Sequence, residues 1–522
     1  MGHTSISLAL ILAGLAVLAL VQGWKARLDA PMRHAALAVA VLLTFVGHLR
    51  VVERRGDDPT PVLARPTVHL HEFLHYFIGT KYFRELGHDD LYEGIVLADH
   101  ADDPAHFVPR DRIRNLSTNR VDRTRADVVR EGARIRERFT DARWEAFRAD
   151  VALLRDAFPS VESWHRSAIL KDHGYNGTPL TSTLFGRISN QPWLSTYAFL
   201  EILRHVDIAL VLAMLALVLW RFGADAALPF AALWYANPFN DFGFIGGSYL
   251  RYDFALCLVA AWLALASRRY AIAGAALATA AHFRIFPVFF AVALVAHDLL
   301  RPGGAARRAA LRAHRRLYAS FAATAVAIAA VCALNPSPPG TNTWSLFLHR
   351  IATQEKAFGL NGVGVESILL PSDEHGEEAM LQLRVAGDAR DWEEVVADHV
   401  ARRWPARAAL VLAVLGGAVV LARRLPFEQA FYLGFPLSFA ALYLSHYYFM
   451  ALGLLALVFR DDERALFVLT AFTGAILVLA APPLFADDIV RFAVVSAVLL
   501  AMLGGAGAAA AWRRRAAPAH TG

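Results

Sequence analysis

Apolar and polar segments alternate along the chain in a pattern that is typical of membrane proteins. Two apolar blocks, 6–21 and 35–51, precede a long polar segment. Further apolar blocks lie near 205–220, 226–240, 252–267, 270–282, 286–300, 318–334, 407–422, 428–444, 447–459, 465–482 and 489–511. Because a helix needs ~20 mostly apolar residues to cross a bilayer, the pattern predicts an all-α, polytopic membrane protein with about 13 transmembrane helices and large outer loops.

The same pattern divides the chain into five regions. The first block lacks the basic start and the small-residue cleavage site of a signal peptide, so we interpret it as a transmembrane helix. The predicted regions are 1–51, two N-terminal transmembrane helices; 52–204, a first outer loop; 205–334, transmembrane helices; 335–406, a second outer loop; and 407–522, C-terminal transmembrane helices with a basic tail.

Arg and Lys residues predict the orientation of these helices. Those in short loops fall on the side that the predicted spans make one face: Lys25, Arg27, Arg33, Arg268, Arg269, 301–316, Arg423, Arg424, Arg460, Arg464 and 513–515. Basic loops favour the cytoplasm, although Arg50, Arg54 and Arg55 fall on the other side. We therefore predict a protein of the inner (plasma) membrane whose active face, with 52–204 and 335–406, lies outside the cytoplasm. The run 301–316 is interpreted as a cytoplasmic loop held by lipid head groups.

Composition narrows the class further. Of the 522 residues, 56% are apolar and 19% charged, with a mean hydropathy of +0.39, which is too little charge for a soluble enzyme of this size. The net charge of +6 is explained by helix-orienting Arg, so no nucleic-acid partner is predicted. Cys257 and Cys332 both lie in apolar blocks, which favours packing over a disulfide or a metal cluster. No cofactor is predicted, and a divalent metal ion stays an open alternative.

The spacing of apolar residues predicts a long helix in one part of the first outer loop. In the stretch "RWEAFRADVALLRDAF", Trp144, Phe147, Val151 and Leu154 recur at steps of three and four residues with charges between them. This spacing is typical of an amphipathic helix. Two interpretations stay open, a helix on the membrane surface and a helix that covers its own domain.

Candidate chemistry begins where the polar segment follows the second block. "HLHEFLHYFIGTKYF" holds His71, Glu72, His75 and Lys81 among aromatic rings. The predicted topology brings further polar residues from other loops to the same face: Arg251, Asp253, His282, Arg284, Asn361 and His446. A carboxylate there can take a proton from an acceptor hydroxyl, and cations can stabilise a leaving phosphate. This combination favours transfer from an anionic lipid.

The order of these motifs resembles the GT-C superfamily of integral-membrane glycosyltransferases, and is most similar to glycosyltransferase family 87, the polyprenol-phosphate-mannose-dependent mannosyltransferases. The resemblance rests on "HEFLHYFIGTKYFRELGHDDLY", with Glu72 at the acidic position, "NPFNDFGFIGGSYLRYDFALCLVAAWLAL", "IAGAALATAAHFRIFP", with Arg284 near the basic position, "LNGVGVES" and "SHYYFMALGLL". This chain has Glu in place of the usual Asp and two spans before the loop, and 95–190 is an insert without a counterpart.

The resemblance implies an inverting glycosyltransferase that moves a sugar from a polyprenyl-phosphate donor to a lipid or envelope-glycan acceptor. Together with the chemistry above it yields a candidate site: Glu72 as general base, with His71, His75, Asp89 and Asp90 as alternates; Arg251, Arg284, His446 and Lys81 on the donor phosphate; and His282, Asn361 and Asp253 lining the cavity. Partial burial should raise the pKa of Glu72.

Two other functions stay open. The first is a transporter or flippase of a lipid-linked glycan, and the second is a membrane transferase that does not act on sugars, or a structural scaffold. Transporters tend to place charged or Gly/Pro-broken positions in mid-span, whereas the ionisable residues of this chain gather at one end of the predicted spans. At the level of the site, the alternative to catalysis is a salt bridge from Glu72 to Lys81 or Arg84 that only shapes the loop.

Overall fold

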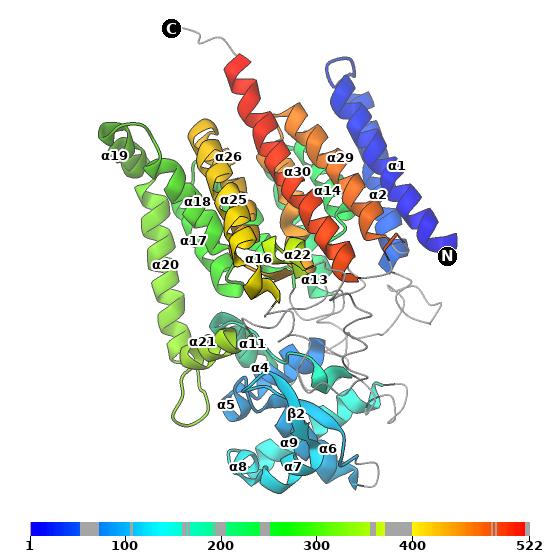
Figure 1. Cartoon of the computed structure of the whole chain (residues 1–522), viewed down its shortest axis with the longest axis vertical. Helices are drawn as coiled ribbons and strands as arrows, with labels where there is room; N and C mark the ends of the chain where they lie inside the picture. The colour runs from blue at the N-terminus through cyan, green and yellow to red at the C-terminus, as the bar shows by residue number, and fades with distance from the viewer. Residues whose placement is uncertain are drawn as a thin grey trace.

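The computed structural model describes the two kinds of segment that the sequence predicts, an apolar helical bundle and a polar part at one end of it (Figure 1). The described residues are 2–52, 72–104, 108–158, 164, 168–191, 193, 205–240, 251–354, 362–370, 399–481, 484–485 and 488–516.

The bundle consists of helices that coincide with the predicted apolar blocks. They are α1 (Gly2–Trp24), α2 (Ala30–Val52), α13 (Val206–Phe222), α14 (Ala224–Ala236), α16 (Asp253–Ala266), α17 (Tyr270–Phe283), α18 (Val288–Leu299), α20 (Arg315–Ala333), α25 (Trp404–Arg424), α29 (Glu463–Ala480) and α30 (Asp488–Ala516). Two blocks each form a series of short helical segments instead. The block at 428–444 forms α26 (Phe427–Ala430), η5 (Phe431–Leu433) and α27 (Gly434–Ala441), and the block at 447–459 forms η6 (His446–Leu454) and α28 (Leu455–Val458).

Six helices of the described chain are long and apolar enough to cross a membrane. They cover Ile6–Trp24, Ala30–Leu49, Arg315–Ala333, Trp404–Arg424, Glu463–Ala480 and Asp488–Trp512. Several other blocks form apolar helices of 10–17 residues, which are shorter than the ~20 residues of a full span. The class of helical membrane protein is thus confirmed, and the number of about 13 spans stays a prediction.

The polar part contains most of the described residues of the first outer loop. Its elements are η1 (Phe73–Ile78), α4 (Gly79–Lys81), α5 (Phe83–Leu86), α6 (Leu91–Asp102), α7 (Arg125–Glu131), α8 (Ala133–Arg136), α9 (Asp141–Asp156), η3 (Ala168–Lys171) and α11 (Pro179–Ser189), joined by the antiparallel hairpin β1 (Arg112–Asn115) and β2 (Arg120–Thr124). α21 (Thr343–Gln354), from the second outer loop, lies beside α11 (Figure 1).

α9 is the amphipathic helix that the sequence predicts. The hydroxyl of Thr140 accepts the backbone N–H of Arg143 and caps its start, as Thr does at helix N-termini. Trp144, Phe147, Val151 and Leu154 are all buried, and the helix packs against α6. Of the two interpretations left open, the helix that covers its own domain is the one this packing supports.

The ends of the bundle differ in charge. The polar part adjoins one end, whereas the α1–α2 turn, the basic helix α19 (Gly304–Ala313) and the C-terminal end of α30 lie at the opposite end (Figure 1). The predicted basic loops and the predicted outer loop are therefore separated by the length of the bundle. Which end faces the cytoplasm stays a prediction.

Cysteine labelling can test that orientation. Glu137 in the polar part and Arg308 in α19 are both exposed, so a Cys at either position should react freely. In intact cells, a membrane-impermeant maleimide is expected to label Glu137→Cys at once and Arg308→Cys only after permeabilisation, because outer loops face the reagent. The reverse pattern would contradict the predicted topology. The native Cys257 and Cys332 are half-buried and buried, which keeps the background low.

Candidate functional site

Glu72 and Arg251 form a buried ion pair where the polar part meets the bundle. Glu72 immediately precedes η1 and Arg251 lies two residues before α16. Nη2 of Arg251 donates a hydrogen bond to Oε1 of Glu72, and the two side chains are 4% and 9% exposed. The carboxyl group of Glu72 thus lies against a cation in the interior of the protein.

Two tyrosine rings lie against the guanidinium of Arg251. Its central carbon is 4.8 Å from the ring centre of Tyr76 on η1 and 5.0 Å from that of Tyr447 on η6. Such cation–π contacts stabilise a buried cation without neutralising it. The hydroxyl of Tyr76 donates to Oδ1 of Asn176 at 2.9 Å, and burial raises the pKa of Tyr76 to about 12. Tyr76 therefore stays protonated at neutral pH.

A second buried guanidinium, that of Arg284, lies at the C-terminal end of α17. Its Nη1 donates to the carbonyl of Phe283 at 2.7 Å. The negative charge of Asp253 attracts this guanidinium, whereas the positive charge of Arg251 repels it. Among the described residues, Nε and Nη2 of Arg284 and Nε and Nη1 of Arg251 have no hydrogen-bond partner. Buried donors are normally satisfied, and guanidinium groups suit anionic oxygens. The pair thus offers unused donors to an anion.

Asp207 fixes the backbone from which Arg251 extends. This residue of α13 is fully buried, and its Oδ1 accepts the backbone N–H of Arg251 at 2.9 Å and of Tyr252 at 3.2 Å. The sequence analysis missed Asp207, although an acidic residue at the start of an apolar block is a signal in itself because a charge there is costly.

The loop after α14 holds the other side of the site. Nδ2 of Asn237 donates to the carbonyls of Phe449 and Met450 in η6, at 3.0 and 2.9 Å. The hydroxyl of Tyr252 donates to Oδ1 of Asn240 at 2.6 Å. The "NPFN" loop thereby ties the Arg251 segment to η6, the element that presents Tyr447 to the guanidinium.

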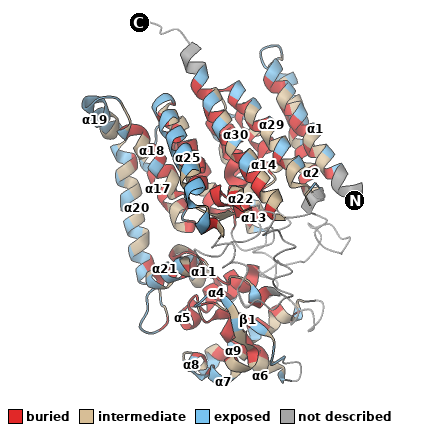
Figure 2. Cartoon of the chain, in the orientation of Figure 1, coloured by how far each residue is buried: buried red, intermediate tan, exposed pale blue. Residues whose placement is uncertain are grey.

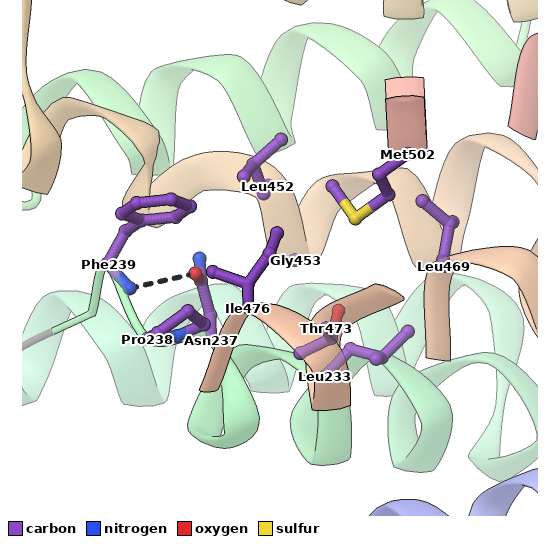
Figure 3. A pocket seen from close by; sticks show the side chains of 10 residues that line it. All are labelled: Leu233, Asn237, Pro238, Phe239, Leu452, Gly453, Leu469, Thr473, Ile476 and Met502. Carbon is purple, nitrogen blue, oxygen red and sulfur yellow. Dashed lines mark hydrogen bonds between the residues drawn. The ribbon is translucent and has the colours of Figure 1, made fainter. Parts of the chain in front are cut away.

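An apolar pocket lies beside this loop and is distinct from the ion pair. Figure 3 shows side chains from α14, η6, α29 and α30 around it. The residues that line it are Leu233, Asn237, Pro238, Phe239, Leu452, Gly453, Leu469, Thr473, Ile476 and Met502. None of the predicted catalytic or phosphate-binding residues is among them.

The other residues that the sequence predicts on the donor phosphate or around the cavity do not all lie together. His446 is buried on η6, with its ring 5.8 Å from that of Tyr447, so it adjoins the site one residue before the stacking tyrosine. Asp253 accepts the backbone N–H of Phe254 at 2.7 Å at the start of α16. His282 is half-buried, with Nδ1 2.7 Å from the carbonyl of Ala278, and its ring lies 6.2 Å from that of Trp344. Asn361 lies outside the described residues.

Lys81 requires a correction. The sequence analysis placed it on the donor phosphate, or alternatively in a salt bridge with Glu72. Its Nζ instead lies 2.5 Å from Oδ2 of Asp150 on α9, and both side chains are buried. The hydroxyl of Tyr82 donates to the same oxygen at 2.7 Å. Lys81 is thus paired inside the polar part, and Glu72 pairs with Arg251 rather than with Lys81 or Arg84.

The alternates to Glu72 have other environments. Nε2 of His75 lies 2.7 Å from the hydroxyl of Tyr92, and Nδ1 lies 3.9 Å from Oδ2 of Asp172. Burial raises the pKa of Asp89.

Asp90 is also engaged in the polar part, because Arg134 and Arg138 contact its carboxylate at 3.0 and 2.7 Å. This double ion pair connects α8, which carries Arg134, and Arg138, two residues after it, to the turn before α6. It favours a structural role for Asp90. The other alternate, His71, lies outside the described residues.

His88 makes the polar part sensitive to acid. Its ring stacks on Tyr175 at 5.1 Å, and burial lowers its pKa from 6.5 to about 3. Between these values the unfolded chain binds a proton that the folded chain does not, so the free energy of unfolding should fall by ~2 kcal/mol from pH 7 to pH 5. Unfolding midpoints at both pH values would show a smaller drop for His88→Phe, and equal drops would contradict the assignment.

The fold and the site together define a helical membrane protein with a buried carboxylate–guanidinium cluster at the boundary of its polar part. No protein-family model matches the chain, and no curated protein or solved structure is significantly similar to it. The described residues contain no group of three or more His, Cys, Asp or Glu side chains arranged to hold a metal ion.

Proposed function

We propose that the chain is a membrane glycosyltransferase of the GT-C type, which moves a sugar from a polyprenyl-phosphate donor to a lipid or envelope-glycan acceptor. The observation that carries the proposal is the buried carboxylate of Glu72 bonded to the guanidinium of Arg251, together with the donors that Arg251 and Arg284 leave unused. An acid–base group and an anion site in contact are what transfer from a phosphate ester requires.

The residues would divide the work as follows. Glu72 takes the proton of the acceptor hydroxyl as that oxygen bonds to the anomeric carbon of the donor. The bond from this carbon to the phosphate oxygen breaks, and the electron pair leaves with the polyprenyl phosphate. Arg251 and Arg284 stabilise the charge on that phosphate, because charge-assisted donors in a water-poor site act strongly on developing charge. Attack from the side opposite the phosphate inverts the anomeric configuration.

The placement of the ionisable residues favours this function over transport. Arg251 precedes α16, Arg284 follows α17 and Glu72 precedes η1, so all three lie at the ends of helices. Transporters instead bind their substrates near the bilayer midplane, at helices that are broken there. A transferase that acts on groups other than sugars would share the same geometry, so the assay must identify the transferred group.

Purified protein in proteoliposomes, supplied with radiolabelled polyprenyl-phosphate sugars, tests the proposal. Mannose comes first in the panel, and a membrane lipid extract serves as acceptor. A glycosyltransferase is expected to move label into an acceptor and to release polyprenyl phosphate in equal amount. A flippase would carry the donor across the bilayer without consuming it. The proposal fails if the wild-type protein consumes no donor of the panel, so that its rate equals that of variants at Glu72 or Arg251.

A further inference from the structure

α19 has two faces of different chemistry, and both are exposed. The helix contains no buried residue, and Figure 2 shows it at the edge of the molecule in the colour of exposed residues. Arg308 and Arg312 are one helical turn apart, with Leu311 and Arg307 beside them, whereas Ala306, Ala309 and Ala313 fall on the opposite side. A helix with a basic face and an apolar face is typical of the membrane interface.

The arginines of this face are not neutralised by the protein. Among the described contacts, none of the side chains of Arg307, Arg308 and Arg312 forms a salt bridge, and Arg312 donates only to the backbone carbonyl of Arg308, at 3.3 Å. The sequence from 299 to 354 contains no Asp or Glu. The neighbouring Arg315 and Arg316 are exposed as well. The positive charge therefore points to an anion outside the chain.

The position of α19 supplies the second condition, nearness to lipid. α20, which follows it, is apolar and long enough to cross a membrane, and only 11% of that span is buried. Its exposed apolar side chains include Val326 and Val331, and Leu334, the residue after its end, is exposed as well. α19 lies at the end of α20 that is remote from the polar part (Figure 1). With α20 in the bilayer, α19 reaches the level of the head groups.

The junction between the two helices is fixed to the bundle. Nδ1 of His314 lies 2.7 Å from Oδ2 of the fully buried Asp298, and the hydroxyl of Tyr318 donates to the same oxygen at 2.6 Å. The ring of His314 also stacks on Phe427 at 3.4 Å. α19 thus extends from an anchored joint, and its arginines are held at a defined depth.

We propose that α19 binds anionic phospholipid head groups through Arg307, Arg308 and Arg312, with its alanine face toward the acyl chains. This site is independent of the proposed transfer reaction and lies at the other end of the bundle. The occupant is an anionic lipid rather than a protein or a nucleic acid, because the helix exposes an apolar face beside its charges and adjoins a lipid-facing span.

Full-length protein in neutral detergent, titrated with dioctanoyl phosphatidylglycerol, tests the proposal by native mass spectrometry and by hydrogen exchange of the amides of 304–316. Phosphatidylglycerol is expected to bind and to slow exchange, and zwitterionic phosphatidylcholine is not. The triple variant R307Q/R308Q/R312Q should bind roughly 100-fold more weakly, since each interfacial arginine contributes about fivefold. Because these side chains contact almost nothing, the variant is expected to fold.

A matched control is R423Q/R424Q, which removes an exposed basic pair from the C-terminal end of α25 and should leave protection of 304–316 unchanged. Equal binding by the triple variant and the wild type would overturn the proposal. So would equal protection by phosphatidylcholine, or protection by soluble glycerol phosphate alone, which would identify a free anion as the ligand. Protection by nucleic acid or by an acidic peptide, but not by phosphatidylglycerol, would assign the surface to a different partner.

Discussion

Replacing Glu72 by Gln is expected to slow sugar transfer by ~10²–10⁴-fold, the usual contribution of a general base. Gln keeps the size of the side chain and can still accept a hydrogen bond from Arg251, but it cannot take a proton from the acceptor. The donor phosphate contacts Arg251 and Arg284 in the proposed complex, so the KM for the donor should change little compared with kcat. Initial rates in proteoliposomes with equal amounts of protein measure both quantities.

Glu85→Gln is the matched control for this variant. Glu85 is also a buried carboxylate of the polar part, and its Oε1 accepts a hydrogen bond from Nε of Arg143 at 2.9 Å. It therefore reports what the loss of one buried charge does to folding, without touching the Arg251 site. If Glu72→Gln transfers sugar at a rate near that of the wild type, Glu72 is not the base. If both variants lose activity in proportion to their protein level, the effect is structural.

Much of the fold follows from the apolar pattern. The block at 407–422 becomes α25, and the block at 465–482 becomes α29, because the backbone of an apolar segment in a bilayer must satisfy its own hydrogen bonds. The number of full spans does not follow in the same way. The block at 428–444 contains Pro436 and resolves into α26, η5 and α27, and hydropathy alone does not register such breaks.

The site was predicted in part, and the misses have a common cause. Glu72 and Arg251 were placed on the same face from topology, but their direct contact joins residues that are 179 positions apart and depends on tertiary packing. Lys81 is close to Glu72 in sequence, yet it turns to Asp150. A signal for this existed, because Asp150 falls within the apolar stripe of α9 between Phe147 and Leu154, where an unpaired charge would be costly.

The same limit applies to Asp90 and Asp207. Asp90 was an alternate base because it follows the aromatic stretch, but the arginines that neutralise it come from α8 and its flank, and no spacing in the sequence links them. Asp207 acts on the backbone of Arg251 from another helix. Sequence patterns thus located the elements that carry the site, whereas the partner of each charge required the structure.

Replacing Arg251 by Gln is expected to destabilise the protein by ~3–5 kcal/mol, because it leaves the buried Glu72 carboxylate without its cation. Removing both charges, in Glu72→Gln/Arg251→Gln, should restore most of that stability, since two neutral amides of similar shape can bond to each other. The double variant should nevertheless stay inactive, because it has neither the base nor one of the phosphate ligands. Denaturation in detergent, followed by tryptophan fluorescence, gives the stabilities of all four members of the cycle. Additive losses in the double variant would contradict a buried ion pair, whereas recovered stability without recovered transfer would separate the role of Arg251 in catalysis from its role in folding.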